Sequence, residues 1–131
     1  MIHNLDEVPR EMLQPRPAVK LCNLIISECL KGGHAGIQLN GGGVYEGMEV
    51  LGVQFLIDGA WKDAMKIPAA GGVAVLAHFR SMCDVDPTGH PQQRGTFKVS
   101  GSGHNASVAA HFTQSADGVE HAELQLSSDR H

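Results

Sequence analysis

Aromatic residues are scarce in this chain, at only 5% of its 131 residues, so Leu, Ile, Val, Ala and Met must fill most of its core. No apolar run approaches the roughly 18 residues that a membrane-spanning helix needs. The first 14 residues carry Asp6, Glu7 and Glu11 and have no apolar stretch like that of a signal peptide. We therefore expect a cytoplasmic protein that does not insert into a membrane.

Cysteines and excess charge are also few. The three cysteines, Cys22, Cys29 and Cys83, are an odd number, and two of them lie in an apolar helical pattern, so we expect reduced core residues and no disulfide framework. The net charge of -4 and the pI near 6.0 argue against nucleic acid and anionic membrane surfaces as partners, because both need basic patches.

What remains is a sequence with regular patterns. Residues 1–17 contain Pro9, Pro15 and Pro17 and are predicted to be a flexible arm ahead of one domain, 18–131. Helical spacing of apolar residues predicts helices over 18–30 and 73–82, with Gly71 and Gly72 weakening the start of the second. Strands are predicted over the ranges 35–39, 50–58, 60–66, 96–100, 106–113 and 119–126.

Glycine-rich segments separate these elements. The Asp58-Gly59 pair predicts a tight turn between two strands, and Asn40 to Gly43 predicts a loop that ends the first strand. Residues 84–93 are predicted to be a polar loop. The order is helix, strand, hairpin, helix and a three-strand meander, which favours an α+β fold. We expect an antiparallel sheet with two main helices on one face, a two-layer domain that resembles PAS-like domains.

No pattern of catalytic residues stands out. The loop from Asn40 to Gly43 lacks the Lys and Ser/Thr of a phosphate-binding loop. His104 and His111 are an odd number of residues apart on one predicted strand, which puts them on opposite faces, and His78 with Cys83 lacks a metal-binding spacing. Acids at 84 and 86 are expected to raise the pKa of the Cys83 thiol. We therefore expect no enzyme activity, no cofactor and no metal.

Several motifs occur in the order in which they occur in one family. They are a helix from Val19 to Gly33, a strand from His34 to Leu39, the run Val53 to Gly59 with Ile57-Asp58-Gly59, a helix end with Arg80 and Met82, the turn Pro91-Gln92, and a last strand through Leu124 and Leu126. Over residues 17–130 the chain resembles the domain that precedes the ATPase core in the bacterial traffic ATPases of type II secretion and type IV pili.

The chain departs from this family at charged positions. The family's Asp and His after the first helix are Gly36 and Gln38 here, and its two strand arginines are Gln54 and Leu56. The family's Glu-Arg-Arg is residues 87–89, its turn Arg is Thr96, and the Arg of its last strand is Gln125. In the family, some of these arginines reach a neighbouring subunit's nucleotide or hold the hexamer. Their loss predicts a degenerate relative without nucleotide contact.

The resemblance implies a non-catalytic interaction, assembly or regulatory domain whose partner is a protein of a secretion or pilus assembly, or another copy of the chain. Its expected contact surface is a sheet edge at the last strand, formed by Val119, Ala122, Leu124 and Leu126. Two alternatives remain open: a fragment of a longer ATPase of this kind, and a PAS-like small-molecule sensor.

Overall fold

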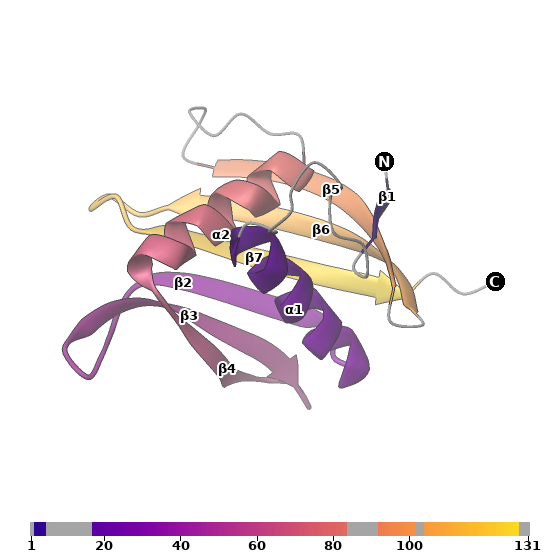
Figure 1. The fold of residues 1–131 in the computed structure, drawn as a ribbon, viewed down its shortest axis with the longest axis horizontal. Helices are drawn as coiled ribbons and strands as arrows, with labels where there is room; N and C mark the ends of the chain where they lie inside the picture. The colour runs from indigo at the N-terminus through magenta and orange to yellow at the C-terminus, as the bar shows by residue number, and fades with distance from the viewer. Residues whose placement is uncertain (1, 5–16, 84–91, 102–103, 129–131) are drawn as a thin grey trace.

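A computed structural model describes residues 2–4, 17–83, 92–101 and 104–128, and it contains one seven-stranded sheet with two helices (Figure 1). Along the chain the elements are β1 (Ile2–Asn4), α1 (Pro17–Lys31), β2 (Gly36–Tyr45), β3 (Met48–Ile57), β4 (Ala60–Pro68), α2 (Ala69–Met82), β5 (Gln92–Gly101), β6 (His104–Gln114) and β7 (Glu120–Ser128). The order of strands across the sheet is β1-β5-β6-β7-β2-β3-β4.

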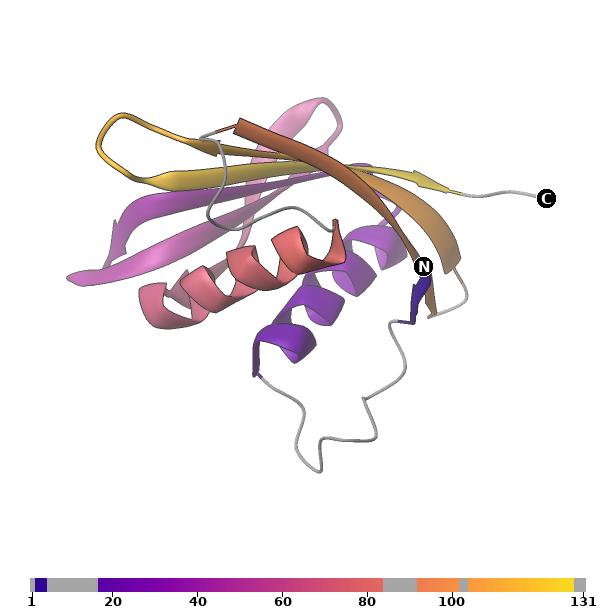
Figure 2. The same cartoon turned by 90° about the horizontal axis from the view of Figure 1, so that it is seen from above.

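All neighbouring strands are antiparallel except β1, which runs parallel to β5. Both helices lie on the same face of the sheet, as the view from above shows (Figure 2). The predicted α+β class, with two helices on one face of an antiparallel sheet, is therefore confirmed. No helix in the described ranges is long and apolar enough to cross a bilayer.

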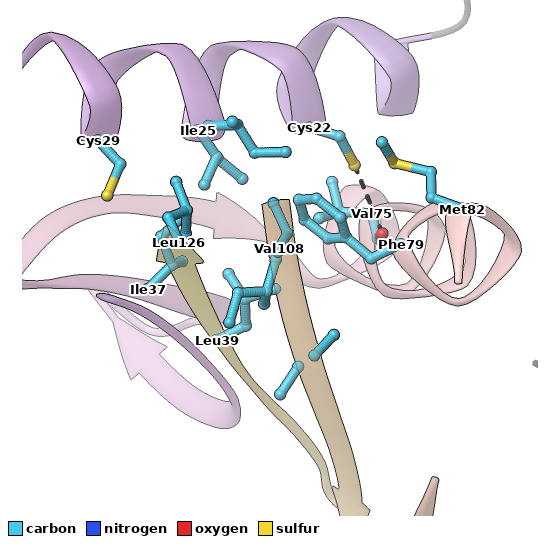
Figure 3. Packing of buried hydrophobic residues seen from close by; sticks show 14 of the residues in the cluster. Cys22, Ile25, Cys29, Ile37, Leu39, Val75, Phe79, Met82, Val108 and Leu126 are labelled. Atoms are coloured by element: carbon cyan, nitrogen blue, oxygen red, sulfur yellow. Dashed lines mark hydrogen bonds between the residues drawn. The ribbon is translucent and has the colours of Figure 1, made fainter. Parts of the chain in front are cut away.

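The buried side of α1 follows the predicted helical spacing. Cys22, Ile25, Ile26 and Cys29 are each fully buried and form one stripe at intervals of three and four residues (Figure 3). The Cys22 thiol donates a hydrogen bond of 3.5 Å to the carbonyl oxygen of Val75 and so ties α1 to α2. All three cysteines are free and buried, which confirms their prediction as core residues.

A glycine sets how closely α2 approaches the sheet. A Cβ atom on Gly72 would lie 2.6 Å from the Cβ of Leu51 on β3, closer than real Cβ contacts come. The helix begins at Ala69 and includes Gly71 and Gly72, whereas the sequence predicted a start near Val73. Contact with β3 outweighs the low helix propensity of glycine here.

The sequence predicts the turn of one hairpin correctly and that of the other incorrectly. Asp58 and Gly59 have φ of 53° and 81° and join β3 to β4, which confirms the predicted turn. The prediction of a loop over Asn40 to Gly43 is wrong, because β2 continues through it with an irregular register between Asn40 and Gly43. The turn lies further on, where Glu46 and Gly47 have φ of 50° and 78°.

The predicted sheet edge at the last strand is also wrong. β7 lies inside the sheet and pairs with β6 on one side and β2 on the other. Ala122, Leu124 and Leu126 point into the core and are buried, and Val119 lies just before the strand and is half-buried. A strand paired on both sides has no free backbone groups to offer to another chain.

The N-terminal segment differs from its prediction where the structure describes it. Ile2 to Asn4 belong to the predicted arm, but they pair with Lys98 to Ser100 of β5. Residues 5–16, and residues 84–91 of the predicted polar loop, lie outside the described residues.

Candidate functional site

The face of the sheet opposite the helices carries mostly polar side chains, because side chains alternate along each strand and the apolar ones point to the helices. No described helix covers this face, which we call the open face. The residues whose side chains define it are Gly36, Gln38, Asn40, Gln54, Leu56, Trp61, Asp63, Arg94, Thr96, Ala109, His111, Thr113, His121, Glu123 and Gln125.

One row of polar side chains crosses all six antiparallel strands of the open face. Backbone register places the members of this polar row directly opposite one another, strand by strand, in the order Arg94, His111, Glu123, Gln38, Gln54 and Asp63. Directly opposite side chains on neighbouring strands lie about 5 Å apart at Cβ and can interact. The row therefore begins with a cation and ends with an acid, and between them lie an imidazole, a second carboxylate and two amides.

Hydrogen bonds order the part of the open face over β7, β2, β3 and β4. Asn40 Nδ2 donates to Gln54 Oε1 at 3.3 Å, and Gln54 Nε2 donates to Asp63 Oδ1 at 3.0 Å. Nδ1 of His121 lies 3.1 Å from Asn40 Oδ1, which only accepts, so His121 carries a proton on Nδ1. The chain of bonds runs from the imidazole to the carboxylate, which fixes the amide orientations.

A hollow of about 570 Å³ lies over β5, β6 and β7 on the same face. Its lining residues are Arg94, Gly95, Thr96, Ala109, Ala110, His111, Glu123 and Gln125. Ala109 has longer neighbours opposite it, Thr96 on one side and Gln125 on the other, so its short side chain leaves the space open. The Nε2 atom of His111 is buried and has no hydrogen-bond partner within the described part of the chain.

The family-motif residues of the sequence analysis do not meet at one place. Asp58 and Gly59 form the β3–β4 turn, and Ile57 packs against the core. Arg80 and Met82 lie on α2 and are buried. Gln92 is exposed at the start of β5, and Pro91 lies outside the described residues.

The contacts of Arg80 stabilise the fold. Its Nη1 lies 3.2 Å from Oε1 of Glu120, and its guanidinium carbon lies 5.2 Å from the centroid of the Phe112 ring. Only 8% of the residue is exposed, and among the residues that the structure describes its Nε has no hydrogen-bond partner. The ion pair and the cation–π contact join α2 to β6 and β7, so Arg80 holds a helix on the sheet.

The departures from the family pattern, in contrast, do converge. Gly36, Gln38, Gln54, Leu56, Thr96 and Gln125 all belong to the open face. At Gly36 a Cβ atom would lie 3.0 Å from the Cβ of Leu56 and 3.2 Å from the Trp61 ring, so these two apolar side chains cover the glycine. Residues 87–89, the remaining departure, lie outside the described residues.

The thiols are poorly suited to nucleophilic chemistry at neutral pH. Burial raises the pKa of Cys29 and of Cys83 to about 11, and it raises the pKa of Cys22 further. The predicted rise at Cys83 is thus present, but its cause among the described residues is burial. Cys83 packs against Gly95: a Cβ atom added to Gly95 would lie 2.5 Å from the Cβ of Cys83. No group of three His, Cys, Asp or Glu within the described ranges is arranged to hold a metal ion.

The polar row and the hollow were not predicted from the sequence. Of their residues, His111 was considered only with His104, and His121, Glu123 and Asp63 were not singled out. Strand alternation is a usable signal, because Glu123 and Gln125 alternate with Leu124 and so lie on the other face of their strand. The residues that these side chains pair with on neighbouring strands could not be predicted, because they depend on the order of strands in the sheet.

No protein-family model matches this chain, and no curated protein sequence matches it.

Proposed function

We propose that this chain is a non-catalytic interaction domain related to the domain ahead of the core in the traffic ATPases of type II secretion and type IV pili. In this proposal the open face of the sheet binds a protein of such an assembly. The observation that carries the proposal is that Gly36, Gln38, Gln54, Leu56, Thr96 and Gln125, the departures from the family pattern, share that face.

The chemistry of these positions supports contact with protein rather than with nucleotide. Arginines grip phosphate through a fixed fork of donors, and glutamine, leucine and threonine do not. Amides in an ordered network, such as Asn40 and Gln54, suit the polar part of a protein interface. The buried frame of the domain keeps its apolar residues, and most of the described departures lie on exposed or half-buried positions.

The centre of the proposed contact is the pair Leu56 and Trp61. They face each other across β3 and β4, and both are half-buried. Tryptophan is enriched among the residues that contribute most to binding, above all where polar groups surround it. Gln54 and Asp63 lie one row further along the same two strands and provide such a polar surround.

The test is capture of the partner by matched variants. Leu56→Arg places a charge in the proposed contact, and Leu24→Arg places the same charge on α1, on the other side of the sheet, where Leu24 is 46% exposed. Tagged chains are expressed in the native host, and captured proteins are identified by mass spectrometry. We expect the wild type and Leu24→Arg to capture a secretion or pilus component, and Leu56→Arg to lose it.

Two results would count against the proposal. One is that the wild type captures no secretion or pilus component. The other is that both leucine variants capture such a component equally well. Circular dichroism of the purified variants shows that each is folded before the comparison is made.

A further inference from the structure

The hollow over β5, β6 and β7 contains more polar groups than the proposed partner contact uses. Arg94 and Glu123 stand on either side of His111 in the polar row, two strands apart. Thr96 and Gln125 stand on either side of Ala109 in the next row. The hollow therefore has a cation on one side, an anion on the other, and hydrogen-bonding groups along its walls.

The two charged groups have no charged partner in the described part of the chain. The ion pairs found there are Lys66 with Asp63 and Arg80 with Glu120, so neither Arg94 nor Glu123 takes part in one. Both residues are exposed and both line the hollow. One strand separates their backbones: neighbouring strands lie about 4.8 Å from each other, and two such steps make about 10 Å.

His111 provides a second, independent indication of a ligand. Its Nε2 is buried within the wall of the hollow and lacks a hydrogen-bond partner among the described residues. Buried polar atoms are nearly always paired, and an unpaired one in a native structure calls for an explanation such as a missing ligand. Because this nitrogen has almost no exposed surface, a polar molecule seated over Ala109 would bond to it only after the His111 ring turns toward the hollow.

The arrangement of charges selects the class of molecule. A simple anion would pair with Arg94 and leave its charge facing Glu123, and a simple cation would do the reverse. A zwitterion satisfies both ends and adds no net charge. We propose that the hollow binds a small zwitterion, with its carboxylate at Arg94 and its ammonium group at Glu123.

Size narrows this class further. The backbones of Arg94 and Glu123 are about 10 Å apart, and in a free amino acid only one carbon separates the two charged groups, so both side chains would have to fold toward the middle of the hollow to reach it. An extended dipeptide spans about 7 Å, since each residue extends by about 3.5 Å, and the two long side chains cover the rest. Its central peptide group would lie beside His111, Thr96 and Gln125. A volume of about 570 Å³ accommodates a dipeptide.

This inference does not rest on the proposed function. Thr96 and Gln125 belong to both surfaces, but the hollow lies over β5 to β7, and the centre of the proposed partner contact, Leu56 and Trp61, lies over β3 and β4. The probe is dialanine, and binding is measured by calorimetry and by chemical shifts of the His111 ring. We expect Arg94→Gln and Glu123→Gln each to weaken binding by about tenfold or more, as loss of one charge-assisted contact does.

The matched control is Lys98→Gln, which removes an exposed cation from the same strand and face as Arg94 but outside the hollow. It is expected to leave the affinity within about twofold. Dialanine acetylated at its amine, or amidated at its carboxylate, is expected to bind about tenfold more weakly. The inference is overturned if dialanine does not bind, if the blocked peptides bind as well as dialanine, or if Lys98→Gln weakens binding as much as Arg94→Gln does.

Discussion

Replacing Gly72 by alanine tests how α2 is seated on the sheet. The added Cβ would lie 2.6 Å from the Cβ of Leu51, an atom that cannot rotate away because it is bonded to the backbone of β3. Overpacking of a core costs about 1–3 kcal/mol, and this rigid contact favours the upper end. Alanine in place of glycine returns at most about 1 kcal/mol of helix propensity. We therefore expect Gly72→Ala to lower the free energy of unfolding by about 2 kcal/mol.

Gly71→Ala is the matched control, one residue earlier in the same helix. Its Cβ would lie 3.2 Å from the Cγ2 methyl group of Ile67, a side-chain atom rather than a Cβ, and 4.0 Å from a methyl carbon of Leu21. The Ile67 side chain can adjust, so we expect stability from unchanged to about 1 kcal/mol higher.

The assay is urea unfolding monitored by circular dichroism. The midpoints of the three proteins are compared on the condition that their m values, the slopes of unfolding free energy against urea concentration, are equal. We expect Gly72→Ala to lower the urea midpoint and Gly71→Ala to leave it unchanged or raise it. The reasoning is refuted if Gly72→Ala is as stable as the wild type, or if Gly71→Ala loses as much stability as Gly72→Ala.

Three further predictions concern the buried ion pair, the thiols and nucleotide binding. Glu120→Gln leaves the Arg80 charge without its partner and is expected to lower the free energy of unfolding by about 1–3 kcal/mol. Adding Arg80→Met should restore part of this stability, as measured by urea unfolding. A double variant less stable than Glu120→Gln would contradict this prediction. Burial raises the thiol pKa of Cys29 and Cys83 from the usual 9.0 to about 11. Between pH 9 and pH 11 the folded state therefore keeps thiol protons that the unfolded state loses. The stability that the buried neutral thiols contribute is lost as the pH rises through this range. Replacing both residues by Ala should flatten that decline in thermal unfolding, and an unchanged decline would refute the assignment. Calorimetry with magnesium ATP should show no binding, and micromolar binding would mean that Arg94 forms a nucleotide site.

The local parts of the fold were predictable because local signals determine them. The apolar stripe of α1 and the Asp58-Gly59 turn needed only spacing and backbone preference. The segment from Asn40 to Gly43 was misread because its glycines serve a distant contact. A Cβ on Gly41 would lie 2.8 Å from the carbonyl oxygen of Glu120, so small residues are needed where β2 passes the start of β7.

The site was less predictable than the fold. Side chains alternate along a strand, so Leu124 lies on one face of the last strand and Glu123 and Gln125 lie on the other. The sequence of one strand does not show, however, which strands lie beside it. β7 was expected at an edge because it ends the meander, yet the sheet places β2 beside it. This long-range pairing brings Gln38 next to Glu123 and completes the polar row, and nothing within either strand encodes it.

Photo-crosslinking from the open face tests the central claim most directly. A photoreactive amino acid replaces Gln54 in one variant and Leu24 on α1 in another, and both are irradiated in the native host. The account predicts that position 54 crosslinks to a protein of a secretion or pilus assembly and that position 24 does not. Crosslinks of that kind from position 24 alone, or none from position 54, would contradict it.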